Sequence, residues 1–365
     1  MSQHDFTRRG FLAGAAAALS PSQARSAKSA PSRRSILNFN NGMEYRRLGK
    51  TGLMVSAVCL GGHWKRVATM ISPGFKGEGY LPADTQNLEN PAFLRNRDEV
   101  ISRAMELGVN YVDACSPQEI LAYSKVLKGR RNRMYFGFSW HTREPRFKEW
   151  RTAQKLVQGL EAGLKEAGLD YVDVWRISLP MDALADLAEL QRVEEATIEG
   201  LAMAKKQGKA RFTGVSSHNR PWLKSLIEQN PKQIEVVLFP YTASSRELPS
   251  DSIFGAIRKH NVGVFGIKPF ANNSLFKGDS SLNSPHKDED DQRARLALRY
   301  ILGNDAITAP IPGLINVHQV ENAAKAVAER RKLDAKERAR LDRACTEMWA
   351  SLRPGYEWLK NWEQV

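Results

Sequence analysis

Short apolar runs alternate with helix-like segments along most of the chain. Eight mostly apolar runs are separated by longer segments in which apolar residues recur at helical spacing. Runs that lack a polar face are typical of parallel strands covered on both sides by helices. The eight runs begin at Ala57, Asn110, Met134, Tyr171, Arg211, Val236, Val262 and Ile307.

This alternation predicts an α/β fold, and the number of units selects its form. Eight strand–helix units match a (β/α)8 TIM barrel better than an open doubly wound sheet. No G-x-G-x-x-G follows any apolar run, which also argues against the open dinucleotide-binding sheet. A short alternating pattern around a Gly-Lys-Thr-Gly turn at 43–56 predicts an N-terminal β-hairpin. The charged segments 317–329 and 334–348 predict extra C-terminal helices.

Both ends of the chain differ in composition from this barrel region. Thr7–Leu12 contains two adjacent arginines and precedes a mild apolar run that is too short to span a membrane. This pattern resembles a twin-arginine export signal, and a disordered basic tail is the alternative. We therefore assign 1–42 to an export signal and linker, 43–348 to the barrel, and 349–365 to a Trp-rich tail. The signal predicts the twin-arginine export machinery as a partner, a periplasmic or exported location, and no stable membrane anchor.

The charge distribution and the cysteine spacing argue against a nucleic-acid-binding module and a metal site. The 365 residues carry a formal net charge of +14, but the basic residues are interspersed with acids and form no nucleic-acid-binding module. We expect a solvated basic surface and no nucleic-acid partner. The three cysteines, Cys59, Cys115 and Cys345, lack metal-ligand or redox spacing, so no metal site is predicted. Cys115 could still contact a ligand, since it lies two residues after Asp113.

The predicted strands end on polar and aromatic residues. In a (β/α)8 barrel these carboxyl ends converge on one face, where the active site lies. The long irregular segment 64–95 follows the first strand, and we expect it to lie over the same face. The residues at the predicted strand ends are His63, Asp113, Trp140, His141, Ser178, Ser216, Ser217, His218, Tyr241, Lys268 and Gly313.

Several of these stretches, taken in order, resemble the aldo/keto reductase family. The similarity extends from about residue 43 to 328, and its most specific parts are Tyr45–Leu53, Leu60–Gly62, Gly108–Asp113, Leu169–Asp173, Gly208–Ser216 and Ile311–Gly313. The resemblance implies a barrel that reduces carbonyls or oxidises alcohols of a small-molecule substrate. It also implies NADP or NAD as cofactor.

The catalytic residues that the family uses are mostly replaced. The family places an Asp, a Tyr, a Lys and a His around the reacting carbonyl, and only the Asp is kept, as Asp113. The Tyr position is Gln118, the Lys position is Trp140, and the His position is Ser178. The resemblance therefore implies an atypical proton relay. By their places at strand ends, the substitutes that we predict beside Asp113 are Lys268, His63 and His141, with His218 as a further candidate.

The cofactor side of the family pattern is better preserved. Ser216 and Ser217 match the pair that holds the nicotinamide carboxamide, and Ile311-Pro312-Gly313 precedes the helix that receives the adenosine phosphate. The segment Leu314–His318 lacks the basic residue that a 2′-phosphate prefers, so NADP and NAD both stay open. The predicted cofactor-binding residues are Ser216, Ser217, Tyr241, Lys268, Pro312, Gly313, Glu321 and Asn322.

Two other functions remain open at this level. Loss of three family catalytic residues would also fit a catalytically inactive barrel that acts as a binding protein. The histidines and the aromatic residues Trp64, Trp140 and Tyr241 near the strand ends would fit a non-redox sugar-processing enzyme. Turnover that needs no nicotinamide would favour the latter.

Overall fold

The computed structural model describes residues 35–71, 88–179, 186–247 and 253–362. All of these belong to one unit, residues 33–365. The predicted export signal and half of the predicted loop over the active-site face, residues 72–87, lie outside the described residues, so both stay predictions. No helix among the described residues has the length and apolar character needed to cross a membrane.

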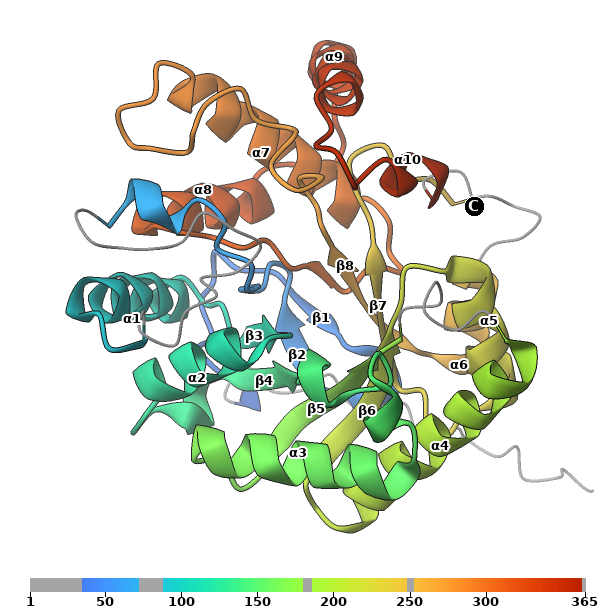
Figure 1. The fold of residues 1–365 in the computed structure, drawn as a ribbon. Coiled ribbons are helices and arrows are strands. Elements are labelled where there is room, and N and C mark those ends of the chain that lie inside the picture. The colour runs from blue at the N-terminus through green and yellow to red at the C-terminus, as the bar shows by residue number, and fades with distance from the viewer. Residues whose placement is uncertain (1–34, 72–87, 180–185, 248–252, 363–365) are drawn as a thin grey trace, which may run out of the picture. The chain divides into compact units, whose positions relative to one another are not determined.

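A parallel sheet curls around the centre of this unit (Figure 1). Each strand pairs with the next one along the chain. Its strands are β3 (Tyr111–Ala114), β4 (Tyr135–Phe138), β5 (Val172–Ser178), β6 (Ala210–Ser216), β7 (Val236–Pro240), β8 (Gly263–Ile267) and β9 (Ala309–Pro310).

The segment before Gly61 closes this sheet into a barrel. Leu60 forms a parallel bridge with Val112 of β3, and the N–H of Cys59 donates to the carbonyl of Pro310 in β9 at 3.1 Å. Beyond it, the N–H of Gly61 donates to the carbonyl of Pro312 at 2.8 Å. These bonds join both edges of the sheet, which confirms the predicted (β/α)8 barrel. The last strand is short because Pro310 and Pro312 have no N–H to donate to a neighbour.

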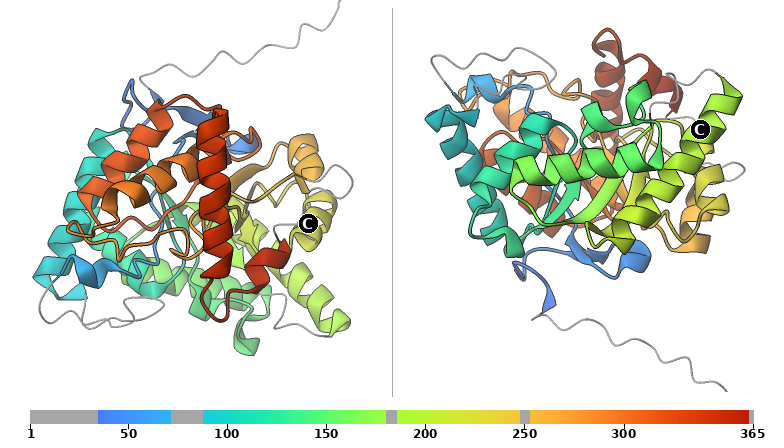
Figure 2. Two further views of the ribbon diagram at one scale, coloured as in Figure 1. Left: turned by 90° about the horizontal axis from the view of Figure 1, so that it is seen from above. Right: turned by 60° about the horizontal axis from the view of Figure 1, so that its bottom comes forward.

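Helices cover the outer face of the sheet (Figure 2). In α3, Leu156, Leu160 and Leu164 recur every four residues and are buried, as expected for a helix on a barrel. Most elements lie where the sequence predicts them. The helices of the barrel are α1 (Pro91–Glu106), α2 (Pro117–Val126), α3 (Ala153–Ala167), α4 (Leu187–Lys206), α5 (Arg220–Gln229), α6 (Ile253–His260), α7 (Lys287–Leu302) and α8 (Val317–Ala328).

The apolar pattern predicts a helix from Glu99 to Gly108, and α1 begins about two turns earlier, at Pro91. The side chain of Asn90 caps it by accepting from the N–H of Ala92 at 2.9 Å, and Pro91 occupies the first turn. Asn before Pro is a recognised start signal, but the charged residues Arg95–Asp98 obscure the apolar stripe. Short 3-10 helices lie between the main elements: η2 (Gly49–Thr51), η3 (Val67–Thr69), η5 (Arg131–Arg133), η6 (His141–Arg143) and η7 (Lys148–Trp150).

The predicted hairpin closes the amino end of the barrel. Strands β1 (Tyr45–Arg47) and β2 (Met54–Ser56) pair antiparallel. Their turn lies so close to β8 that a Cβ on Gly49 would come within 2.3 Å of the Gly263 nitrogen. Leu48 from this hairpin joins Tyr111 and Phe265 in the apolar cluster inside the barrel. Because this end is filled, only the carboxyl end is left for a ligand.

Of the two C-terminal helices that the sequence predicts, 317–329 is α8 of the barrel and 334–348 is α9 (Ala335–Ala350), which follows it; the short helix α10 (Trp358–Trp362) in the Trp-rich tail was not predicted. Helix α9 starts with a capping box between Asp334 and Glu337, and α10 follows it. An ion pair joins α7 to α9, since Nη1 of Arg299 on α7 lies 2.8 Å from Oε1 of Glu337 on α9. The chain between α9 and α10 brings the Trp-rich tail to the carboxyl end of the barrel.

Candidate active site

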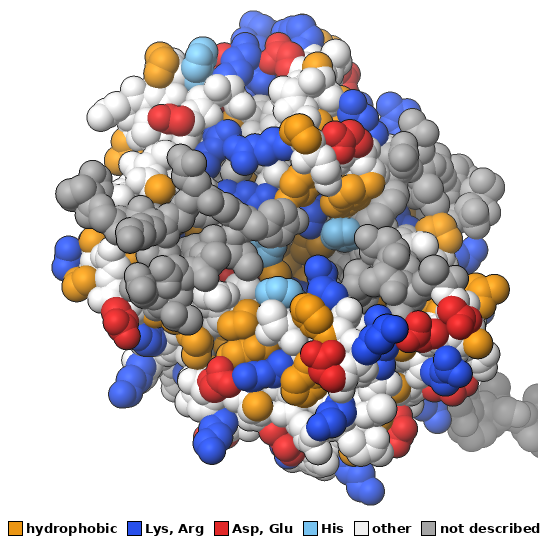
Figure 3. All heavy atoms as spheres, in the orientation of Figure 1, with side chains coloured by type: hydrophobic (Ala, Val, Ile, Leu, Met, Phe, Trp, Pro, Cys, Tyr) orange, Lys and Arg blue, Asp and Glu red, His pale blue; other side chains and the backbone are white. Residues whose placement is uncertain are grey.

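The carboxyl ends of the strands surround a cavity of about 720 Å³. Histidine and basic side chains gather around the hollow on this face (Figure 3). The structure thus brings together most of the residues predicted from the strand ends. Those that line the cavity are His63, Asp113, His141, Ser178, Ser216, Ser217, His218, Lys268, Pro312 and Gly313.

Asp113 forms a buried, two-pronged ion pair with Arg176 of β5. Nη2 of Arg176 lies 2.5 Å from Oδ2 of Asp113, and Nε lies 3.1 Å from Oδ1. The two side chains are only 4% and 6% exposed. Although burial opposes it, the charge of Asp113 raises the pKa of Arg176. Arg176 therefore supplies the fixed cation beside Asp113 that sequence reasoning found missing.

Sequence reasoning missed Arg176 itself. It interrupts the apolar run of β5, where a guanidinium can be buried only with an anionic partner. The arginine inside an apolar run could have been noticed in the sequence. The sequence alone does not show toward which face of the sheet its side chain projects. The parallel register, which pairs Arg176 with Gly214, is what the structure adds.

Lys268 and His218 form a second polar pair. Nζ of Lys268 lies 3.3 Å from Nε2 of His218. Burial lowers the pKa of Lys268 to about 8, and burial together with the charge of Lys268 lowers the pKa of His218 to about 2. His218 is therefore neutral near pH 7, and its Nε2 accepts a hydrogen bond from the ammonium group of Lys268. Trp358 of the tail stacks on the His218 ring at 4.4 Å.

A third basic group, Lys65, lies on the tail side of the cavity. Its Nζ donates to the hydroxyl of Tyr356 at 2.8 Å and to Asn272. Burial, reinforced by Lys268 and Arg353, lowers the pKa of Lys65 to about 7. Both lining acids already have cationic or imidazole partners, so the cations give the cavity a surplus of positive charge. That surplus suits an anionic ligand.

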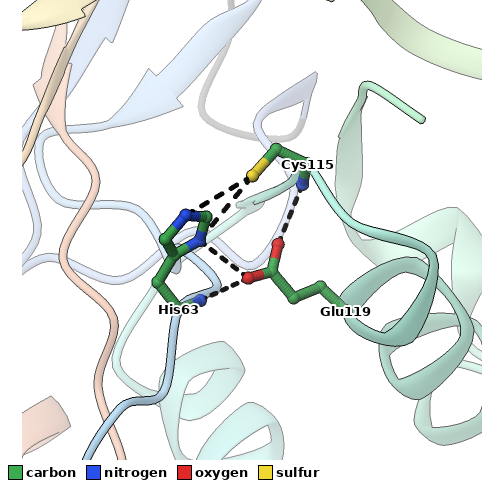
Figure 4. A group of neighbouring side chains, drawn as sticks. All are labelled: His63, Cys115 and Glu119. Carbon is green, nitrogen blue, oxygen red and sulfur yellow. Dashed lines mark hydrogen bonds and ion pairs between the residues drawn. The ribbon is translucent and has the colours of Figure 1, made fainter. Parts of the chain in front are cut away.

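The lining acid other than Asp113 is Glu119, which holds His63 and Cys115 (Figure 4). Oε1 of Glu119 lies 2.8 Å from Nδ1 of His63, and Oε2 accepts the N–H of Cys115 at 2.9 Å. Burial opposes ionisation, but the charge and hydrogen bonds of His63 lower the pKa of Glu119 to about 2. The sequence predicted neither Glu119 as a site residue nor a metal site. The structure nevertheless places three metal-ligating side chains together.

His141, another predicted catalytic residue, is held by the backbone beside this cluster. Its Nδ1 lies 2.8 Å from the carbonyl oxygen of Cys115, and because that oxygen only accepts, Nδ1 is the donor. Burial lowers the pKa of His141. Its ring is therefore a neutral group on the cavity wall with its orientation fixed.

A smaller cavity of about 60 Å³ lies next to the start of α8. It shares Lys65, Phe270, Asn273 and Gly313 with the large cavity. His318 lies in its lining, with Nε2 2.6 Å from Oδ2 of Asp291. The shared residues place the two cavities side by side, so together they form one elongated hollow.

Four predicted residues differ in placement from the rest. Tyr241 lies outside both cavities, since its ring packs edge-on against Phe254 and its hydroxyl accepts from Asn304 at 3.0 Å. Glu321 forms an ion pair with Arg103 of α1 at 2.8 Å, again outside both cavities. These placements give no support to a cofactor contact by either residue. The other two are Asn322, which lines the smaller cavity, and Trp140, which is buried and lines neither.

Tyr123, in the helix that follows Asp113, lines neither cavity. Its side chain is buried in α2, and its hydroxyl donates to the carbonyl of Gly61 at 2.6 Å. Burial raises its pKa above the usual value. It therefore acts in packing.

Comparison with known proteins agrees with this architecture. The family model "Aldo/keto reductase family" matches residues 90–345. L-galactose dehydrogenase of Arabidopsis thaliana is 23% identical over 309 residues, which is 79% of this chain and 89% of that protein. Aldo-keto reductase AKR11C1 from Bacillus halodurans superposes with a TM-score of 0.57 at 22% identity, over 83% of this chain and 96% of its own. The Bombyx mori aldo-keto reductase AKR2E4, solved in complex with NADP, has a TM-score of 0.55 at 16% identity, over 82% and 92%. Since the family model covers well over half of the sequence, the chain belongs to the aldo/keto reductase family.

Proposed function

We propose that the protein is an NAD(P)-dependent oxidoreductase that interconverts a small carbonyl compound and its alcohol through an atypical proton relay. Members of the family are generally NAD(P)-dependent oxidoreductases. The observation that carries the proposal is the pair of adjoining cavities at the carboxyl ends of the strands. A dinucleotide needs such an elongated site, with cations near its middle for the pyrophosphate.

The lining residues fit a nicotinamide cofactor. Ser216 and Ser217 offer hydroxyl groups for a carboxamide at one end. Lys65 lines both cavities and stands at their junction, where the pyrophosphate would lie. The bound cofactor would supply the hydride for the carbonyl carbon.

Lys268 is the group that best replaces the family tyrosine as proton donor. A pKa of about 8 leaves it mostly protonated near neutral pH and still able to release the proton. His218 holds its Nζ at 3.3 Å and fixes its direction. In reduction Lys268 would protonate the carbonyl oxygen, and in oxidation its neutral amine would take the proton back. Arg176 would stabilise negative charge on that oxygen while Asp113 holds the guanidinium in place.

The same cavities favour NAD over NADP. A carboxylate at the far end suits a ribose 2′-hydroxyl and repels a 2′-phosphate. Asp291 lies there with His318, and it also holds Lys287, whose Nζ lies 3.3 Å from its Oδ2. Asp291 therefore already neutralises the charge of Lys287. Because His318 occupies a position where a phosphate would want Arg or Lys, we propose NAD as the preferred cofactor.

A sugar or another polyhydroxylated compound is the substrate class to test first. The Arabidopsis relative is named for oxidation of L-galactose. In this chain, Tyr356 and Trp358 present aromatic side chains to the cavity, and aromatic rings commonly pack against sugar rings. The twin-arginine segment adds the proposal that the protein works in the periplasm or outside the cell. Cell fractionation of the wild type and of a variant with Arg8→Lys and Arg9→Lys tests it, and retention of both in the cytoplasm would contradict it.

Titration with NADH and NADPH tests the proposed function directly. Binding to the purified full chain should be seen as a change in nicotinamide fluorescence, with tighter binding of NADH. Competition by NAD+ serves as the control for specificity. If neither reduced cofactor binds at millimolar concentration, the proposal fails and a catalytically inactive or non-redox barrel takes its place.

A further inference from the structure

We propose that His63, Cys115 and Glu119 bind a thiophilic divalent metal ion, with Zn²⁺ as the best match. Their donor atoms all lie within 4.8 Å of one another. One thiolate, one imidazole and one carboxylate make a ligand set that zinc accepts, and harder cations such as Mg²⁺ do not select a thiolate. Binding of the metal does not depend on the proposed redox function.

The distances within the cluster are close to those of a metal centre. Bonds of about 2.3 Å from zinc to sulfur and about 2.0 Å from zinc to nitrogen, at a tetrahedral angle, separate the two donors by roughly 3.5 Å. Sγ of Cys115 lies 3.6 Å from Nδ1 of His63. Nδ1 also lies 2.8 Å from Oε1 of Glu119, so a metal would replace the proton that these two atoms share. For both atoms to bind the metal, Nδ1 and Oε1 would have to separate by about half an ångström.

The backbone around the cluster is built to hold these side chains. Glu119 stands three residues after Ser116, which caps α2, and a Glu there usually returns its side chain to the cap residue. Here its carboxylate instead accepts the N–H groups of His63 and Cys115. His63 has a φ of 56°, a left-handed conformation that a residue with a side chain rarely adopts. Such strain is concentrated at functional sites.

Tight packing fixes the carboxylate in this place. A Cβ on Gly62 would come within 2.0 Å of the carboxyl carbon of Glu119, so only glycine allows the approach. The side chain of Glu119 is fully buried, whereas that of His63 is 33% exposed. All three ligands line the large cavity. A metal held here would therefore keep a coordination position open toward the substrate, as catalytic zinc sites do.

This position gives the metal a role in the reaction, and that role rests on the proposed function. The cluster surrounds the start of α2, where the family tyrosine is replaced by Gln118. A Lewis acid at the open position would polarise a carbonyl oxygen and stabilise the alkoxide form of an alcohol. It would thus do part of the work of the missing acid, beside the proton donor Lys268.

Cobalt titration of the full-length protein tests the site. After treatment with a chelator, one equivalent of Co²⁺ should produce the near-ultraviolet band of thiolate-to-cobalt charge transfer and the intense visible bands of tetrahedral coordination. Zn²⁺ should displace Co²⁺ at one ion per chain, measured by competition with a chromophoric chelator. Co²⁺ spectra without a thiolate band, or no saturable binding, would overturn the proposal.

Variants distinguish this site from adventitious binding. Cys115→Ser is nearly isosteric and should abolish the charge-transfer band, whereas Cys345→Ser on α9 should leave it unchanged. His63→Asn should weaken binding by at least about tenfold. A band that survives Cys115→Ser would refute the assignment, and circular dichroism would show whether each variant is folded. NADH titration of the same samples separates the two proposals, because cofactor binding without cobalt binding would remove only the metal site.

Discussion

Asp113, near the end of β3, and Arg176, on β5, bridge the intervening strand β4 through two hydrogen bonds of 3.1 and 2.5 Å. Each is almost fully buried, so neither charge can be solvated if the other is removed. The pair is thus both part of the candidate active site and a requirement for the folded state. Loss of one partner should affect stability before it affects chemistry.

Arg176→Met should destabilise the protein by about 3–5 kcal/mol, because it leaves Asp113 as an uncompensated buried charge. Unfolding in urea, followed by circular dichroism, measures this change. The double variant Asp113→Asn/Arg176→Met should recover part of the loss, since it buries no net charge. Arg103→Met, which removes the exposed ion pair with Glu321, is the control and should leave stability nearly unchanged, because solvent screens that pair. An Arg176→Met variant as stable as this control would contradict the buried-pair account.

Lys268→Met should reduce carbonyl-reducing turnover by about 10²–10⁴-fold, because it removes the proposed proton donor. In the wild type, reduction requires the ammonium form. Its rate should be full below the pKa of about 8 and should fall as pH rises above it, while alcohol oxidation should rise over the same range.

The control for this prediction is Lys155→Met, which changes an exposed lysine of α3. Its kcat and pH profile should match those of the wild type. A reduction rate that stays constant through pH 9 in the wild type would show that Lys268 does not supply the proton.

The fold could be predicted from sequence because it depends on a repeated local pattern. Each apolar run can only be a buried strand, and eight of them with intervening helices have one common closed arrangement. Asp113, Lys268 and His63 could be placed at the cavity for the same reason, since each lies at or shortly after the carboxyl end of an apolar run. The start of α1 was misplaced because Arg97 occupies the buried face between Phe93 and Val100 and so interrupts the apolar stripe.

The polar partners of these residues could not be predicted in this way. Arg176 pairs with a residue 63 positions away, and His63 meets Cys115 across 52 positions. Both contacts depend on which strands become neighbours and on the side toward which each side chain projects. Tyr241 and Glu321 were predicted to contact the cofactor from their positions in the sequence, yet their side chains line neither cavity. A position that matches the family pattern therefore does not guarantee that the side chain faces the ligand. Glu119 resembles an ordinary capping residue in the sequence, and only its contacts in three dimensions show another role.

His318→Arg should shift cofactor preference toward NADPH. The wild type should bind NADH more tightly, because Asp291 disfavours a 2′-phosphate near the start of α8. An arginine at 318 would offer a bidentate partner for that phosphate and should improve NADPH binding by about tenfold. Fluorescence titration with both cofactors measures the ratio of their dissociation constants. A wild type that already prefers NADPH, or a ratio unchanged in the variant, would contradict this placement of the adenosine end.

Cofactor binding should weaken as pH rises through about 7, because Lys65 then loses its proton. The sign follows from the lowered pKa, since the charged lysine that attracts the pyrophosphate predominates only below that pH. Lys268 and Arg353 are the cations that face Lys65 and hold its pKa down. Lys65→Gln should therefore bind NADH more weakly at pH 6 and lose most of the change in affinity between pH 6 and pH 8. Titrations at low and high salt at each pH provide the control, because the effect should shrink when salt screens the charges. If Lys65→Gln keeps the pH dependence of the wild type, the pyrophosphate does not lie at the junction of the two cavities.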